Sequence, residues 1–436
     1  MTKIDTDMDY VKLLRALIFT ALFILYVNNF TYASNMLFNK INNNCIWIKY
    51  ESIKDSSAAN RMIDFLINNK INKVFFETYR NGEILHTESK KIFESFNGYF
   101  EEQYISGNDT TYLRGYDPVQ PDTIISIIYN PTAYFMTKID SLDDIQIYAW
   151  MDMYRLWSKN FYPDNQDHFY YKCPECLESD INGRSDKLIK LDKIQSLEWE
   201  GIFLSPLHPS VNQYLSDIVS KIMEDYNFNG ILLDYIRYQN YYYGYNEEGI
   251  QLFEDMYNIN PFDLHRGLIS RHFGYSQTEI DSIQNLWDNY REIKITELVQ
   301  TIKTIIDEDS LGHELLVSVK ASPYESKDRW YQNWSNWMQT NLVDYVVIEN
   351  HTLNFHEFNY NNKILGKLYN NEFDLDKIII GFNSYTDNSI DLANKILSLR
   401  LQKFNNISLY YYESYKKEIN WYSPVYNVIN FNIDNE

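Results

Sequence analysis

Short apolar runs alternate with longer amphipathic stretches along most of the chain. Eight of the runs have the length and the aliphatic and aromatic content of buried strands. They lie at residues 45–48, 73–76, 145–150, 231–233, 314–319, 343–348, 377–382 and 407–412. Helical periodicity predicts helices at residues 57–69, 122–138, 210–226, 286–306, 328–340 and 389–403. The clearest helical stretch is 210–226, where Val211, Leu215, Val219 and Ile222 share one face.

This alternation predicts an α/β protein, a (β/α)8 TIM barrel made of eight strand–helix units. We expect long insertions after strands 3 and 4, because about residues 157–199 and the tyrosine-rich segment from 238 onward fit neither pattern. An open doubly wound sheet is the alternative. It is less favoured because no glycine-rich phosphate loop follows any strand.

The N-terminal segment has the pattern of a secretory leader. Lys12 and Arg15 precede an apolar run at 16–27, and small residues follow at 31–34. We therefore expect a signal peptide or an uncleaved membrane anchor over residues 1–34, and one barrel domain over residues 35–436. Either form of the leader places the domain outside the cytoplasm, as a secreted, periplasmic or cell-surface protein.

Charge and cysteine content narrow the function classes. The net charge of −21 disfavours binding to nucleic acid, which is a polyanion. Aromatic residues reach 17 %, which suits sugar rings as well as protein cores. Cys173 and Cys176 form one CxxC motif, with His168 as the nearest histidine. We expect a loop disulfide or two free thiols there, because a structural zinc site needs further ligands.

In a TIM barrel, the residues that follow each strand converge on one rim. Here these residues are mainly carboxylates and cations. They are Glu51, Glu77, Arg80, Asp152, Asp234, Arg237, Tyr238, Lys320, Glu349, His351 and Glu413. Several carboxylates among aromatic residues fit glycoside hydrolysis, which needs one carboxylic acid and one carboxylate. No HxH or HExxH pair signals a catalytic metal, no cofactor is expected, and no GxSxG elbow is present.

Two segments carry a family resemblance. The first runs from Gly201 to Pro206 and on through His208-Pro209, and the second is the string from Asn229 to Tyr238, which reads NGILLDYIRY. Together with residues 75–80, 148–150 and 343–347, they resemble the glycosyl hydrolase-like 10 family over about residues 45–415. The resemblance implies a TIM-barrel glycosidase that acts on bacterial cell-wall or extracellular polysaccharide, including the glycan of peptidoglycan.

The resemblance and the rim together give each residue an expected role. Asp234 is the expected nucleophile or proton donor, Glu349 its partner, and Glu77 the competing choice of partner. Arg237 would orient Asp234, or else form a structural salt bridge to Asp234 without a substrate role. The remaining expected substrate-binding residues are Arg80, Trp150, Asp152, His208, Tyr238, Lys320 and His351. Trp150 and Tyr238 would stack on sugars; barrel core is the alternative for Trp150, and a helix-start contact is the alternative for His208.

Three departures from the family pattern keep a second function open. Asn229 stands where the family has Asp, Leu232 stands where it has His, and the end of strand six differs. A secreted glycan-binding protein on an inactive hydrolase barrel would explain them. A hydrolase of another bond type is the third alternative, because a fold alone does not set the chemistry.

Overall fold

The computed structural model describes most of the chain after the leader. The described residues are 41–85, 89–106, 109–121, 123–142, 144–194, 199–308, 311–369, 375–383, 388–410 and 421–430. The leader expected at 1–34 and the rim residue Glu413 lie outside them.

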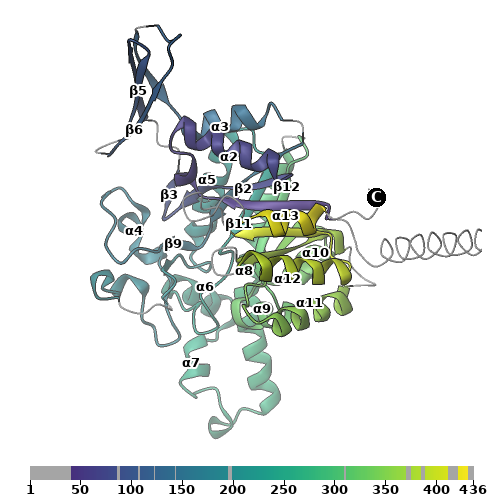
Figure 1. Cartoon of the computed structure of the whole chain (residues 1–436). Helices are drawn as coiled ribbons and strands as arrows, with labels where there is room; N and C mark the ends of the chain where they lie inside the picture. The colour runs from purple at the N-terminus through teal and green to yellow at the C-terminus, as the bar shows by residue number, and fades with distance from the viewer. Residues whose placement is uncertain are drawn as a thin grey trace, which may run out of the picture.

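Eight parallel strands close into a barrel (Figure 1). In order around the barrel they are β1 (Asn43–Ile48), β2 (Lys73–Arg80), β8 (Gln146–Asp152), β11 (Gly230–Asp234), β12 (Glu314–Lys320), β13 (Tyr345–Glu349), β14 (Ile378–Asn383) and β15 (Asn406–Tyr410). Pairing of β1 with both β15 and β2 completes the ring. The TIM-barrel prediction is confirmed, and each predicted strand coincides with one of these eight.

Helices surround the barrel (Figure 1). They are α2 (Ser56–Asn68), α3 (Pro131–Ile139), α5 (Pro209–Asp225), α8 (Gln277–Glu308), α9 (Pro323–Trp330), α10 (Trp334–Gln339), α11 (Phe355–Tyr369), α12 (Ser389–Leu401) and α13 (Ser423–Asn430). The single helix predicted at 328–340 is wrong, because Tyr331 adopts a left-handed conformation (φ +58°) and ends α9 before α10 begins. Among the described helices, none is both long and apolar enough to cross a membrane.

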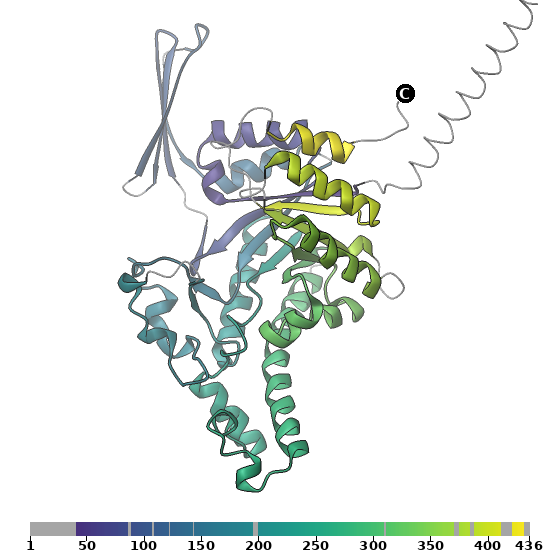
Figure 2. The ribbon, with the colours of Figure 1, turned by 60° about the horizontal axis from the view of Figure 1, so that its bottom comes forward.

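A four-stranded antiparallel sheet stands away from the barrel between β2 and α3 (Figure 2). Its strands are β4 (Ser89–Phe96), β5 (Tyr99–Ser106), β6 (Asp109–Tyr116) and β7 (Thr123–Tyr129). This sheet was not predicted from the sequence. The helix predicted at 122–138 is wrong in its first half, which is β7, and its second half is α3. Pairing of Phe96 with Tyr99 and of Tyr99 with Tyr116 puts three exposed rings on one face of the sheet.

Further elements lie on the connections that leave β8 and β11. After β8 they are β9 (Arg155–Trp157), α4 (Phe169–Lys172) and β10 (Ile202–Phe203). Short 3-10 helices of three residues, such as Pro174–Cys176, also lie on this connection. After β11 they are α6 (Glu247–Tyr257) and α7 (Pro261–His265). Both connections begin at the carboxyl ends of their strands, which is the catalytic end of a TIM barrel.

The interior of the barrel is packed with side chains. Inward-facing residues from the strands form one buried cluster that includes Trp47, Phe75, Trp150 and Leu232. Trp47 meets Trp150 edge to face, with ring centroids 4.9 Å apart. The barrel is therefore a filled core, and chemistry is confined to its two ends.

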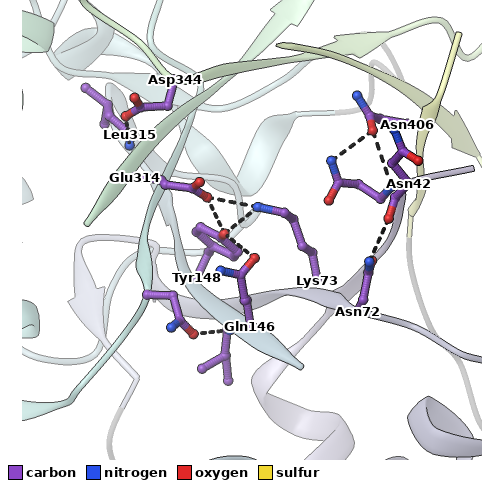
Figure 3. Close-up of polar contacts among 12 residues, drawn as sticks. Asn42, Asn72, Lys73, Gln146, Tyr148, Glu314, Leu315, Asp344 and Asn406 are labelled. Atoms are coloured by element: carbon purple, nitrogen blue, oxygen red, sulfur yellow. Dashed lines mark hydrogen bonds and ion pairs between the residues drawn. The ribbon is translucent and has the colours of Figure 1, made fainter. Parts of the chain in front are cut away.

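A buried polar network occupies the amino-terminal end of the barrel (Figure 3). Lys73 Nζ lies 2.6 Å from Tyr148 Oη and 2.8 Å from Glu314 Oε2, and Tyr148 also donates to Glu314. Burial, opposed by the positive charge of Lys73, raises the pKa of the Cys45 thiol to about 12. These residues are at the end of the barrel whose conserved contacts usually serve stability, so we assign them a structural role.

Candidate active site

Four carboxylates gather at the opposite end of the barrel. Glu77, Asp152, Asp234 and Glu349 lie at the carboxyl-terminal parts of β2, β8, β11 and β13. The strand register places Asp152 directly beside Asp234. Because the strands are parallel and neighbouring, their ends meet at one mouth, as the sequence predicted.

Asp234 is held by two donors. Its Oδ2 accepts from Trp150 Nε1 at 3.2 Å, and its Oδ1 accepts from the backbone N–H of Tyr235 at 2.9 Å. Its exposed fraction is 6 %. Burial raises the pKa of Asp234 to about 7, and the negative charges of Asp152 and Glu349 act in the same direction. Asp234 is therefore able to keep a proton near neutral pH.

The chain turns sharply after Asp234. Tyr235 has φ of +51°, a left-handed conformation that is rare for a residue with a bulky side chain. Backbone bonds from Met153 to the Asp234 carbonyl and from Tyr154 to the Tyr235 carbonyl hold this turn. Such strain costs about 1–3 kcal/mol and clusters at functional sites, where surrounding contacts fix the conformation.

Glu349 lies in the opposite electrostatic environment. Lys320 Nζ is 2.5 Å from its Oε2, and Ser318 Oγ is 3.0 Å from its Oε1. Burial by itself raises the pKa of Glu349, but the positive charge of Lys320, together with His351 and Arg237, lowers it to about 2. Glu349 is therefore ionised at every pH at which the protein is expected to work.

The mouth is open to solvent on the β12–β13 side. The side chains of Lys320 and Glu349 are 25 % and 21 % exposed, whereas Asp152 is 2 % exposed. Two cavities of about 810 Å³ and 780 Å³ lie elsewhere. The first is at the amino-terminal end of the barrel, and the second is among the elements that follow β8 and β11; neither is lined by the four carboxylates.

Arg155 is a residue of the mouth that the sequence analysis left out of the site. Its guanidinium pairs with Asp152, with Nε 3.1 Å from Oδ2, and it lies 3.6 Å from the centre of the Tyr235 ring. Its positive charge also opposes the rise of the Asp234 pKa. The signal was present in the sequence, because Asp152 and Arg155 repeat the acid-x-x-Arg spacing of Glu77 and Arg80.

Glu77 forms a separate ion-pair group at the β2 side of the mouth. Arg80 links it to Glu51, with Arg80 Nη1 3.0 Å from Glu77 Oε1. The backbone N–H of Tyr50 donates to Glu77 Oε2 at 3.3 Å. Burial raises the pKa of Glu77 to about 7, although Arg80 opposes the rise. Arg80 therefore holds two carboxylates of the rim.

Arg237 does not bind Asp234. Among the described residues its partners are Glu200, at 2.8 Å, and the backbone carbonyls of Tyr238 and Gln239. The expectation that it orients Asp234 by a hydrogen bond is wrong, because the turn at Tyr235 directs the side chain toward Glu200. The alternative, a structural salt bridge from Arg237 to Asp234, is wrong for the same reason, because the ion pair of Arg237 is with Glu200.

The expected sugar-stacking residues are both buried. Trp150 is 2 % exposed and lies in the barrel interior, where its indole N–H holds Asp234. Tyr238 is 1 % exposed, meets Tyr331 edge to face and donates to the Arg291 carbonyl. Neither ring exposes a face on which a sugar could stack. The contribution of Trp150 to the site is its hydrogen bond to Asp234.

The two expected site histidines lie in different places. His351 stacks on Tyr410 with ring centroids 5.9 Å apart, and its charge acts on Glu349, so it belongs to the mouth. His208 caps the start of α5 and contacts Cys176 and Glu248. It belongs to the elements between β8 and α5, apart from the four carboxylates.

The fold and the mouth define a class: a TIM barrel with several carboxylates at the carboxyl ends of its strands. The model of the glycosyl hydrolase-like 10 family matches residues 184–373, which include Asp234 and Glu349. This match confirms the family resemblance drawn from the sequence. No curated protein sequence matches the chain.

Several solved structures that resemble the chain are glycosidases of low sequence identity. The catalytic domain of β-amylase from Paenibacillus polymyxa has 10 % identity and a TM-score of 0.46, over 84 % of this chain and 91 % of that one. The α-L-fucosidase isoenzyme 2 from Paenibacillus thiaminolyticus has 8 % identity and a TM-score of 0.49, over 88 % of this chain and 48 % of that one. A β-galactosidase from Bacillus circulans sp. alkalophilus has 10 % identity and a TM-score of 0.49, over 86 % and 50 %. The strand order of the barrel, rather than these likenesses, establishes the fold.

Proposed function

We propose that the protein is a glycoside hydrolase in which Asp234 is the general acid and Glu349 is the ionised carboxylate. One observation carries the proposal: the pKa of Asp234 is raised to about 7 while that of Glu349 is lowered to about 2. Two carboxyl groups with opposed environments at one mouth are the arrangement that divides acid and base roles in glycosidases.

In this proposal Asp234 gives its proton to the glycosidic oxygen as the bond to the anomeric carbon breaks. Glu349 either attacks the anomeric carbon or takes a proton from the attacking water, and in both cases it opposes the positive charge that develops on the sugar ring. Arg155 and Trp150 position the acid, since Arg155 sets the charge beside it and Trp150 holds one of its oxygens.

Glu77 is a weaker candidate for either role. It lies on β2, which β8 separates from β11, and Arg80 already pairs with it. A substrate would have to displace that pair to reach Glu77. We therefore place Glu77 and Arg80 on the wall that binds hydroxyl or carboxylate groups of the glycan.

The substrate proposed is a cell-wall or extracellular polysaccharide, including the glycan of peptidoglycan. The support is the family match over residues 184–373 together with the secretory pattern of the leader. The acidic surface, with a net charge of −21, favours neutral glycans or glycans that carry amino groups over polyanions.

The Lys320–Glu349 contact is the observation that favours a glycan-binding protein without turnover, since an ion pair of 2.5 Å occupies one carboxylate oxygen. The departure at the end of strand six lies at the mouth, beside Glu349, but the other two family departures do not favour it. Asn229 lies at the start of β11, where its Oδ1 accepts from the Ile147 N–H, and Leu232 is inside the barrel. Neither position is at the mouth.

Release of reducing ends from purified peptidoglycan and neutral polysaccharides tests the proposal. Wild-type protein is compared with Asp234→Asn, Glu349→Gln and the exposed control Asp217→Asn. We expect turnover by the wild type and the control and a loss of about 10²–10⁴-fold in the two site variants, because general acid or base catalysis contributes a factor of that size. Glycan binding with no reducing ends, or unchanged turnover by Asp234→Asn, would contradict the proposal.

A further inference from the structure

The CxxC motif lies against a histidine that is distant in sequence. Cys173 and Cys176 form a disulfide, and Cys176 Sγ is 3.4 Å from His208 Nδ1. One ligand atom from each of these three residues lies within 4.8 Å of the others. Cys176 is fully buried and His208 is 5 % exposed. The fold thus brings two sulfurs and one imidazole nitrogen to a single protected point.

The histidine presents the correct nitrogen to the sulfurs. Its other ring nitrogen, Nε2, lies 3.2 Å from Glu248 Oε2. The Glu248 carboxylate beside Nε2 favours the proton on that nitrogen and leaves Nδ1 with a lone pair, although the geometry of the contact is not that of a hydrogen bond. Nδ1 also accepts a long contact of 3.3 Å from the Ser210 N–H, which a stronger ligand can replace.

We propose that Cys173, Cys176 and His208 form a zinc site when the disulfide is reduced. A tetrahedral zinc ion holds a thiolate sulfur at about 2.3 Å and an imidazole nitrogen at about 2.0 Å, which separates the two ligand atoms by about 3.5 Å. The 3.4 Å between Cys176 Sγ and His208 Nδ1 matches this value. Two thiolates and one imidazole leave a fourth position for water or another ligand.

A dithiol reductant supplies the electrons and protons that reduce the disulfide. The reductant passes two electrons and two protons to the Cys173–Cys176 bond, which becomes two thiols, while the reductant becomes a disulfide. Zinc binding then releases the two thiol protons, because thiolates are the ligands. The same two cysteines therefore hold the connection between β8 and α5 in either state, by a disulfide or by a metal that also ties them to the start of α5.

His168, which is nearer in sequence, does not take part. Its Nε2 lies 2.7 Å from the Asn81 carbonyl oxygen, and its Nδ1 accepts from the Tyr170 N–H at 3.1 Å. Both nitrogens are used at the start of α4. The site is independent of the proposed glycosidase activity, since it uses none of the four carboxylates of the mouth.

Cobalt binding to the full-length protein tests the proposal, because Co²⁺ occupies zinc sites and reports thiolate ligands by absorption. The protein is reduced with dithiothreitol, separated from it without oxygen, and titrated with Co²⁺. We expect one Co²⁺ per chain, a thiolate-to-cobalt charge-transfer band, the visible spectrum of tetrahedral cobalt, and displacement by Zn²⁺. Oxidised protein titrated with Co²⁺ should show neither the charge-transfer band nor the spectrum of tetrahedral cobalt.

Variants separate the site from adventitious thiol binding. His208→Asn keeps a capping side chain for α5 and removes the nitrogen ligand, so it should weaken binding by at least about 100-fold. Cys45→Ala removes the remaining thiol and should bind as the wild type does. Glu248→Gln tests the positioning contact and should weaken binding by about 10-fold.

Three results would overturn the proposal. They are reduced wild type without the charge-transfer band, His208→Asn with unchanged affinity, and Cys45→Ala with lost binding. Circular dichroism of the oxidised variants verifies that each is folded before reduction. If His208→Asn fails this check, Cys176→Ser takes its place, and loss of the charge-transfer band is again expected.

Discussion

Lys320→Met removes the cation that keeps Glu349 ionised. In the wild type Lys320 Nζ is 2.5 Å from Glu349 Oε2, and the pKa of Glu349 is lowered from 4.5 to about 2. Methionine keeps the length of the side chain but carries no charge. Burial then dominates, because it is the largest influence on this carboxyl group, and it raises the pKa of Glu349.

The size of the effect follows from the shift. Loss of the lysine should raise the pKa of Glu349 from about 2 toward its ordinary value of 4.5, a shift of about two units. At about 1.36 kcal/mol per unit, this corresponds to roughly 3 kcal/mol of differential stabilisation of the ionised form. At a pH below its pKa, Glu349 is protonated and cannot act as the ionised carboxylate. A higher pKa of Glu349 therefore moves the acid limb of the activity profile to higher pH.

The assay is kcat/KM against pH on the glycan that the wild type cleaves, since this ratio reports the ionisations of the free enzyme. The wild type should show no acid limb above pH of about 4, and Lys320→Met should show one near pH 5. Lys294→Met, which breaks a 2.9 Å pair with Glu297 on α8, is the control and should leave the profile unchanged. An unchanged acid limb in Lys320→Met would refute the role given to Glu349.

Two further predictions concern stability. Lys73→Met leaves Glu314 and Tyr148 without their cation at the amino-terminal end of the barrel, and should lower the free energy of unfolding by on the order of 3 kcal/mol. The exposed control Lys221→Met should lower it by under about 1 kcal/mol. Chemical denaturation measures both, and equal losses would contradict the structural role of the network. Burial raises the pKa of Glu178 to about 8, so its protonated form is favoured in the folded state, and its contribution to stability is lost as the pH rises from 4.5 through 8. Glu178 is 1 % exposed. Glu178→Gln should therefore flatten the fall of the melting temperature between pH 5 and pH 8, and an equally steep fall would contradict the raised pKa of this carboxyl group.

The strands of the barrel were predictable because parallel strands buried on both faces are continuous apolar runs. The run Ile231-Leu232-Leu233 is an example: Leu232 faces the barrel interior, and its neighbours face the helices. The sheet β4–β7 was not predictable in this way. It stands away from the barrel, and exposed aromatic residues such as Phe96, Tyr99 and Tyr116 share its strands with charged residues, so no clean alternation marks them.

The positions of the mouth residues followed from the strand ends, but their partners did not. The spacing Asp234-x-x-Arg237 is the same as Asp152-x-x-Arg155, yet only the second pair forms an ion pair. The left-handed turn at Tyr235 separates Arg237 from Asp234, and a tyrosine in the sequence does not indicate such a conformation. Likewise, the pairing of His208 with Cys176 depends on how the connection between β8 and α5 folds back on itself.

The most direct measurement of the central claim is the pKa of each of the two carboxyl groups, which needs no substrate. Protein labelled with ¹³C at the aspartate and glutamate carboxyl carbons is titrated by NMR, with Asp234→Asn and Glu349→Gln used to assign the two signals. We expect Asp234 to titrate near pH 7 and Glu349 to remain ionised down to the lowest pH at which the protein is folded. An Asp234 signal that titrates below pH 4, or a Glu349 signal that titrates above it, would contradict the division of acid and base between them.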